Sequence, residues 1–144
     1  MDRKHFVKYS ITAGAGVCAL GLLHGCSLLD EPEMKVGRLS DLEEQVYIIS
    51  RFNRKKILTT RLEGELVIFS LVCRHKRCTV AYEEDSEQFV CPCHEGIYDK
   101  YGQVVDGPPP APLHRYKQEI RGNEIWVINE YLRTDFSTSS TPPA

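Results

Sequence analysis

The sequence lacks the usual signatures of nucleic-acid binding and of catalysis. No basic stretch is interleaved with aromatic residues, and the formal net charge is only −2, so no nucleic acid partner is expected. No glycine-rich phosphate loop, no acid–base dyad and no catalytic nucleophile is visible. These absences indicate a carrier or binding protein, with any substrate chemistry located elsewhere.

Helical periodicity is also scarce, and the only helical hint is one turn near 40–44, which Ser40 could cap. Short β-branched and apolar runs occur instead, at 46–49, 56–61, 66–72, 88–90, 113–120 and 125–128. Turn signals at 63–65 and 121–124 separate two pairs of these runs, which is typical of antiparallel hairpins. At 144 residues the chain has room for one domain, which we expect to be all-β and built of small antiparallel sheets.

Charged residues are missing from Tyr9 to Leu29, directly after the basic residues Arg3, Lys4 and Lys8. A basic segment followed by an apolar one is typical of an export signal, which we assign to 1–25. The stretch 3–8 resembles a twin-arginine signal with Lys4 in place of the second arginine, and a general secretory signal is the alternative.

The end of this segment, Leu23-His24-Gly25-Cys26, resembles a bacterial lipobox with Cys26 as the lipidated residue. The alternative is an uncleaved anchor, because 21 residues without charge could span a bilayer as a helix of about 30 Å. Both interpretations tether the protein to a membrane. We expect a polar linker over 26–35, the folded domain over 36–130 and a disordered tail over 131–144.

Six cysteines are many for a chain of this length, and four of them fall within 21 residues: Cys73, Cys78, Cys91 and Cys93. Histidines accompany them in Cys73-Arg74-His75 and in Cys91-Pro92-Cys93-His94. Two short loops that each supply a thiolate and an imidazole can place two sulfurs on one iron and two nitrogens on another. Structural zinc and plain disulfides are the alternatives, although the chain has no Cys-x-x-Cys knuckle.

The pattern Cys-x-His-x15-Cys-x-x-His is similar to that of the Rieske iron–sulfur family. The resemblance implies a single two-iron, two-sulfur cluster, with Cys73 and Cys91 on one iron and His75 and His94 on the other. It also implies a Rieske-like fold, in which an inserted subdomain carries cluster-binding loops at 73–78 and 91–98. Imidazole ligands make the cluster less negative than four thiolates would, so its potential rises.

Further residues match the respiratory branch of this family. The positions of Cys78 and Cys93 match a disulfide that ties the two loops together, and a disulfide needs an oxidising compartment. Tyr98 matches a tyrosine whose hydroxyl bonds a ligand cysteine, and 106–113 resembles the proline loop that covers the cluster. High-potential members carry a serine hydroxyl where this chain has Gly96, so Gly96→Ser is expected to raise the potential.

Three functional hypotheses follow from these features. The first is a one-electron carrier in a membrane-linked respiratory chain, such as the iron–sulfur subunit of a quinol–cytochrome oxidoreductase. The second is the small Rieske subunit of a periplasmic molybdenum oxidase of the arsenite oxidase type, and the third is a non-catalytic metal or disulfide module. We expect an exported protein, tethered in the periplasm or at the outer face of a bacterial membrane. We expect its electron donor to be membrane-bound, either a quinol–cytochrome b-like subunit or a molybdenum subunit. We expect its electron acceptor to be a cytochrome.

Overall fold

The computed structural model describes residues 29–132 of the chain. The expected export signal over 1–25, the lipobox cysteine Cys26 and most of the expected tail lie outside the described residues. Within the described part, no helix has both the length and the apolar character needed to cross a membrane.

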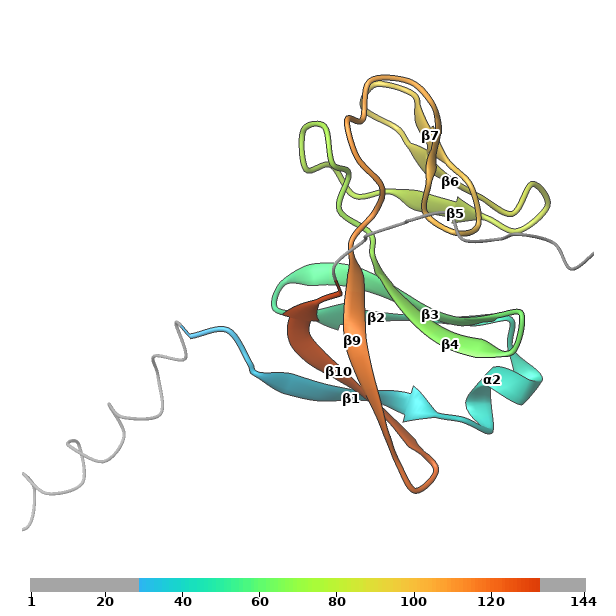
Figure 1. The fold of residues 1–144 in the computed structure, drawn as a ribbon, viewed down its shortest axis with the longest axis vertical. Coiled ribbons are helices and arrows are strands. Elements are labelled where there is room, and N and C mark those ends of the chain that lie inside the picture. Colours follow the sequence, from blue (N-terminus) through green and yellow to red (C-terminus); the bar gives the residue numbers. More distant parts are fainter. Residues whose placement is uncertain (1–28, 133–144) are drawn as a thin grey trace, which may run out of the picture. The chain divides into compact units, whose positions relative to one another are not determined.

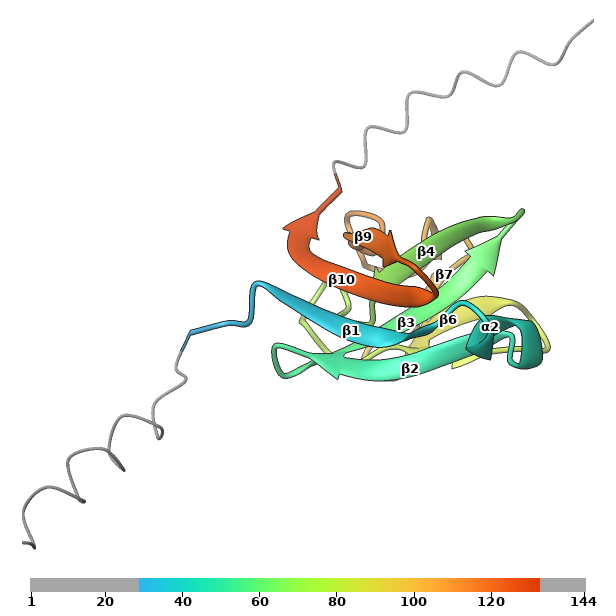
Figure 2. The ribbon, with the colours of Figure 1, turned by 90° about the horizontal axis from the view of Figure 1, so that it is seen from below.

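The larger of two antiparallel sheets forms a base with the strand order β1-β10-β9-β4-β3-β2 (Figure 1). Its strands are β1 (Glu33–Arg38), β2 (Tyr47–Phe52), β3 (Lys55–Leu62), β4 (Glu65–Ser70), β9 (Arg115–Arg121) and β10 (Glu124–Tyr131). The two edge strands β1 and β2 also contact each other, so the sheet is curled, as Figure 2 shows from below. This curling encloses the first part of the hydrophobic core.

Tight two-residue turns set the register of this sheet. Phe52 pairs with Lys55, so only Asn53 and Arg54 connect β2 to β3, and both have the left-handed backbone that such turns require. Glu63 and Gly64 connect β3 to β4 in the same way. The hairpin expected around 121–124 is present between β9 and β10.

The core has two parts. The first lies within the base and is formed by Val36, Leu42, Phe52, Ile57, Ile68, Tyr116, Ile125 and Val127. The second joins the base to the cysteine-bearing loops and is formed by Leu58, Val67, Phe69, Leu71, Cys73, Val80, Phe89, Cys91, Tyr98 and Leu113. Because two cysteines belong to this second part, the packing of the base fixes where their side chains lie.

The smaller sheet has the order β5-β6-β7-β8, with β5 (Ala81–Glu83), β6 (Gln88–Cys91), β7 (Gly96–Tyr98) and β8 (Val104–Asp106). It lies in the segment between β4 and β9, which pair with each other in the base through Ile68 and Tyr116. The segment is therefore a subdomain inserted into the base, and it lies above the base in Figure 1. The expected all-β fold with an inserted subdomain is confirmed.

Three expectations need correction. Residues 33–35, assigned to the linker, form the first half of β1, because Met34 pairs with Val127 and packs against the core. Tyr131, assigned to the tail, is the last residue of β10. The single turn α2 (Asp41–Glu44) is present, but the Ser40 side chain does not cap it; the Asp41 carboxylate instead accepts the Arg38 backbone N–H at 2.8 Å.

Candidate metal centre

The first cysteine loop, 73–78, is closed by its own backbone. The Cys73 N–H donates to the Cys78 carbonyl at 2.8 Å, and the Arg77 N–H donates to the Cys73 carbonyl at 3.0 Å. Arg77 reaches this conformation only with a left-handed backbone, at φ 63°. A non-glycine residue in that region costs about 1–2 kcal/mol, so this loop shape is held against local preference.

The second loop is the hairpin end between β6 and β7. Cys91 pairs with Gly96 across it, so Pro92, Cys93, His94 and Glu95 form the exposed tip. Glu95 also has a left-handed backbone, at φ 55°. Both loops thus bend sharply beside a histidine.

The loops place two free thiols in the interior. Cys73 is 2% exposed and Cys91 is 1% exposed, and neither forms a disulfide. Burial disfavours the Cys73 thiolate, but hydrogen bonds from the Tyr98 hydroxyl and the His75 backbone outweigh it, so the pKa of Cys73 lies below its usual value. Burial raises the pKa of Cys91, with its neighbour Cys73 adding to the effect. Each thiol therefore affects the ionisation of the other, and the surroundings of Cys73 favour the thiolate form that binds metal.

The two expected histidine ligands lie against each other, with His94 exposed and His75 half-buried. The rings of His75 and His94 lie edge to face with centroids 4.8 Å apart, although they come from different loops. Nδ1 of His75 is buried and has no hydrogen-bond partner among the described residues. An unpartnered buried nitrogen is costly, and a metal ion bonded to it would remove that cost. This donor set of two thiols and two imidazoles fits an iron–sulfur centre.

The Tyr98 side chain contacts the Cys73 thiol. Its side chain is fully buried, and its hydroxyl oxygen lies 3.4 Å from Cys73 Sγ. The same hydroxyl accepts the Arg74 backbone N–H at 3.1 Å, so its own proton is left to point at the sulfur. The expected contact between Tyr98 and a ligand cysteine is present in the structure.

The remaining cysteine pair forms the disulfide Cys78–Cys93, as the resemblance implied. It ties the two loops together across 15 residues of sequence. The sulfurs of Cys78, Cys91 and Cys93 lie within 4.8 Å of one another. They do not make a separate metal site, because two of them are consumed in the disulfide.

A third loop, 107–112, packs on the second one. A side chain on Gly96 would place its Cβ 2.6 Å from Cγ of the buried Pro109, and a Cβ on Gly107 would lie 2.8 Å from Cα of Gly96. The backbones can approach this closely only because both positions are glycine. The expected gain in potential from Gly96→Ser is therefore revised, since the serine would displace the proline loop before its hydroxyl reached the centre.

Comparison with known proteins gives the same result. The profile of the Rieske [2Fe-2S] domain matches residues 32–117. The cytochrome b6-f complex iron-sulfur subunit of Chlorobaculum thiosulfatiphilum is 36% identical over 95 residues, which is 66% of this chain and 52% of that protein. The menaquinol:cytochrome c reductase iron-sulfur subunit of Geobacillus thermodenitrificans is 29% identical over 153 residues, covering 88% and 90% of the two chains.

A crystal structure of the cyanobacterial plasma membrane Rieske protein PetC3 from Synechocystis PCC 6803 superimposes with a TM-score of 0.57 at 26% identity. The match covers 65% of this chain and 97% of that one. The chain spans about half the length of the Chlorobaculum relative. Since the matched profile covers more than half of the chain, this protein belongs to the Rieske iron–sulfur family, whose domain holds one two-iron, two-sulfur cluster.

Proposed function

We propose that this chain is a one-electron carrier of a membrane-linked respiratory chain, as the iron–sulfur subunit of a quinol–cytochrome oxidoreductase. Its cluster is held by Cys73 and Cys91 on one iron and by His75 and His94 on the other. The names of the relatives support the type of complex, because they are iron–sulfur subunits of a cytochrome b6-f complex and a menaquinol:cytochrome c reductase.

Two pairs of side chains, each drawn from both loops, carry this proposal. The buried thiols of Cys73 and Cys91 affect each other's ionisation, and the rings of His75 and His94 lie 4.8 Å apart. Packing within the described part of the chain leaves Nδ1 of His75 buried and without a hydrogen-bond partner, which a metal bond would relieve. A set of two sulfurs and two imidazole nitrogens is the one that a Rieske cluster requires.

The chain's own residues orient and insulate this centre. When bound, the cluster takes up and releases a single electron. The core around Cys73 and Cys91 excludes water from the sulfur side, while His94 is exposed and His75 half-buried. An electron therefore enters and leaves most directly through the histidine edge, where a partner can approach. The disulfide and the proline loop hold the two loops in one geometry as the charge changes.

The cellular setting is part of the proposal. The Cys78–Cys93 disulfide is stable in an oxidising compartment, which agrees with an export signal over 1–25. Lipidation of Cys26, or retention of the uncharged segment, would tether the domain close to a membrane-bound donor, and a cytochrome would accept the electron.

The test is a comparison of two histidine variants in the full-length protein. His94→Ala should abolish the electron paramagnetic resonance signal of the reduced cluster and lower iron and acid-labile sulfide together. His114→Ala is the control, because His114 lies outside both loops, stacked on Tyr131. Full iron content and an unchanged spectrum in His94→Ala would refute the ligand assignment.

A further inference from the structure

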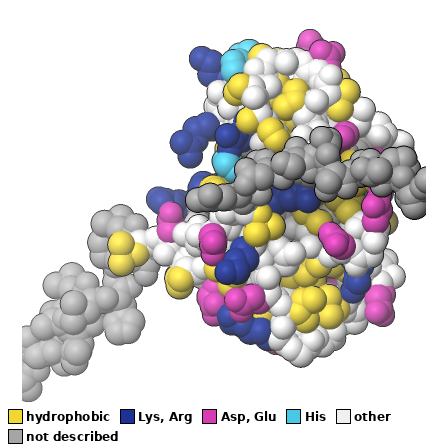
Figure 3. Space-filling model, in the orientation of Figure 1, with side chains coloured by type: hydrophobic (Ala, Val, Ile, Leu, Met, Phe, Trp, Pro, Cys, Tyr) yellow, Lys and Arg dark blue, Asp and Glu magenta, His cyan; other side chains and the backbone are white. Residues whose placement is uncertain are grey.

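Basic residues are concentrated on one side of this net-negative protein. Residues 51–56 and 74–77 together hold seven Lys and Arg and no Asp or Glu. The first segment is the end of the β2–β3 hairpin, and the second is the first cysteine loop. Figure 3 shows the Lys and Arg side chains along one edge of the described unit, beginning beside a histidine at its upper end.

Folding brings these two segments together around two neighbouring hollows. One, of about 370 Å³, is lined by Lys55, Arg74 and Arg77, and the other, of about 220 Å³, also includes Lys55 and Arg77. Among residues 29–132, no acidic residue lines either hollow. We name this surface the cationic face, and define it by Arg51, Arg54, Lys55, Lys56, Arg74 and Arg77.

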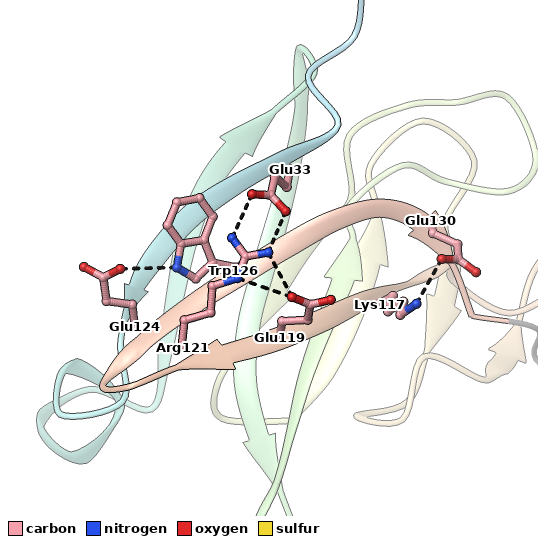
Figure 4. A network of polar contacts seen from close by, with 7 residues as sticks. All are labelled: Glu33, Lys117, Glu119, Arg121, Glu124, Trp126 and Glu130. Atoms are coloured by element: carbon pink, nitrogen blue, oxygen red, sulfur yellow. Dashed lines mark hydrogen bonds and ion pairs between the residues drawn. The ribbon is translucent and has the colours of Figure 1, made fainter.

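Several basic residues elsewhere on the described surface pair with nearby carboxylates, although Arg61 does not take part in an ion pair that the structure shows within residues 29–132. Arg121 pairs with Glu33 at 2.7 Å, and Lys117 pairs with Glu130 at 3.3 Å (Figure 4). The cationic face differs. Leaving Arg54 aside, no residue of the cationic face takes part in an ion pair that the structure shows within residues 29–132.

Like charges are even placed opposite each other on this face. Arg51 and Lys56 are direct partners across the β2–β3 ladder, an arrangement that destabilises a sheet. His114, which lines the larger hollow, is also affected by the positive charge of this face. Burial first, and then Arg74 and Lys55, lower the pKa of its imidazole. An anionic partner would offset the repulsion that these cations exert on one another in the free protein.

The face also borders the metal centre. Cys73 and Arg74 line the larger hollow, and the Arg77 N–H donates to the Cys73 carbonyl. A partner seated there would contact the same loop that carries a proposed iron ligand. The two hollows suit projecting carboxylate side chains of a protein better than the flat surface of a bilayer. The sequence shows cations beside His75 at Lys76 and Arg77, but not that the two basic segments meet, because 17 residues separate them.

We propose that the cationic face is the docking surface for an acidic redox partner protein, which it steers toward the histidine edge. This inference rests on the proposed function and adds the chemistry of the partner. Opposite charge across an interface raises the association rate, and salt removes that gain.

The experiment uses the full-length, cluster-loaded protein and two c-type cytochromes as probes, one rich in surface carboxylates and one rich in lysine. The test variant is Lys56→Glu/Arg77→Glu, in which both exposed side chains are reversed. The control is Arg61→Glu/Lys117→Glu, which makes the same change in net charge on other exposed parts of the base. Stopped-flow rates are measured at several ionic strengths, with the cluster potential measured for each variant to correct for driving force.

At low ionic strength, the second-order rate with the acidic cytochrome should fall at least about tenfold in the test variant and less than about twofold in the control. The rates should converge at high salt, and the lysine-rich cytochrome should show no loss. Equal losses in both variants, or a loss that persists at high salt, would overturn the inference. So would an unchanged cytochrome rate combined with weaker binding to anionic phospholipid vesicles, which would assign the face to a membrane.

Failure of the proposed function is recognised separately. If the wild-type protein shows no reduced-cluster signal, it is not a Rieske carrier. Binding of the acidic cytochrome, measured by calorimetry, then still decides the docking inference. Weaker binding in the test variant alone supports the docking surface, and equal binding in both variants refutes it.

Discussion

Removing the Tyr98 hydroxyl should lower the potential of the cluster. In the structure this hydroxyl accepts the Arg74 N–H at 3.1 Å and lies 3.4 Å from Cys73 Sγ. Its proton therefore points at the sulfur, and a donor of this kind favours the more negative, reduced state. Tyr98→Phe deletes that donor while keeping the ring that fills the core.

The expected size follows from the strength of such bonds. A hydrogen bond to a charged acceptor contributes about 1.5–3 kcal/mol, and only part of this differs between the two oxidation states. A difference of about 1 kcal/mol corresponds to about 40 mV for a one-electron couple. We therefore expect a potential about 40 mV lower in Tyr98→Phe. The Arg74 N–H also loses its acceptor, so the free energy of unfolding should drop by about 1 kcal/mol.

Protein-film voltammetry measures the shift, with Tyr116→Phe as the control. Tyr116 is equally buried, but its hydroxyl lies 3.2 Å from that of Tyr131 in the base. Its removal should change stability and leave the potential as it is. A Tyr98→Phe potential equal to or above the wild-type value would show that the hydroxyl does not donate to the sulfur.

Two further variants test the loops. Cys78→Ser/Cys93→Ser opens a 15-residue loop and should lower the free energy of unfolding, measured by urea titration, by about 3 kcal/mol. The iron content should be retained, and a loss of iron would mean that these sulfurs bind it. Gly96→Ser should press on Pro109 and give a lower melting temperature, faster loss of iron to a chelator and no rise in potential. Adding Pro109→Ala should recover part of the lost stability, and a stable Gly96→Ser variant with a higher potential would contradict the steric argument.

Strands with strong local signals could be predicted from the sequence, and short ones could not. The runs at 56–61 and 66–72 form β3 and β4, since apolar β-branched residues flank a readable turn. The strand β7 is three residues long and has no alternation to detect. It exists because Ile97 and Tyr98 pair with Val90 and Phe89 on the neighbouring strand. The first half of β1, residues 33–35, falls in the expected linker because charged residues there hide the pairing with β10.

The site shows the same division. The spacing of the cysteines and histidines can be read from the sequence, so the resemblance predicts which of them are ligands. The contact between Gly96 and Pro109 joins loops that are 13 residues apart and has no local signature. The left-handed backbone of Arg77 and Glu95 could not be predicted either, because neither residue type favours it. Such features depend on tertiary packing and appear only when the chain is folded.

The two sides of the centre serve different tasks because of how they are packed. Cys73 and Cys91 belong to the core that joins both sheets, so moving either would disturb the packing of the base. His94 is exposed at a hairpin end, where contact with a partner costs little rearrangement. With the proposed ligands, rigidity on the sulfur side would keep the geometry similar in both oxidation states, and exposure on the nitrogen side would shorten the distance to a partner. The proposed docking on the cationic face would then act on encounter alone, because it could orient an acidic partner without altering the buried packing around the thiols.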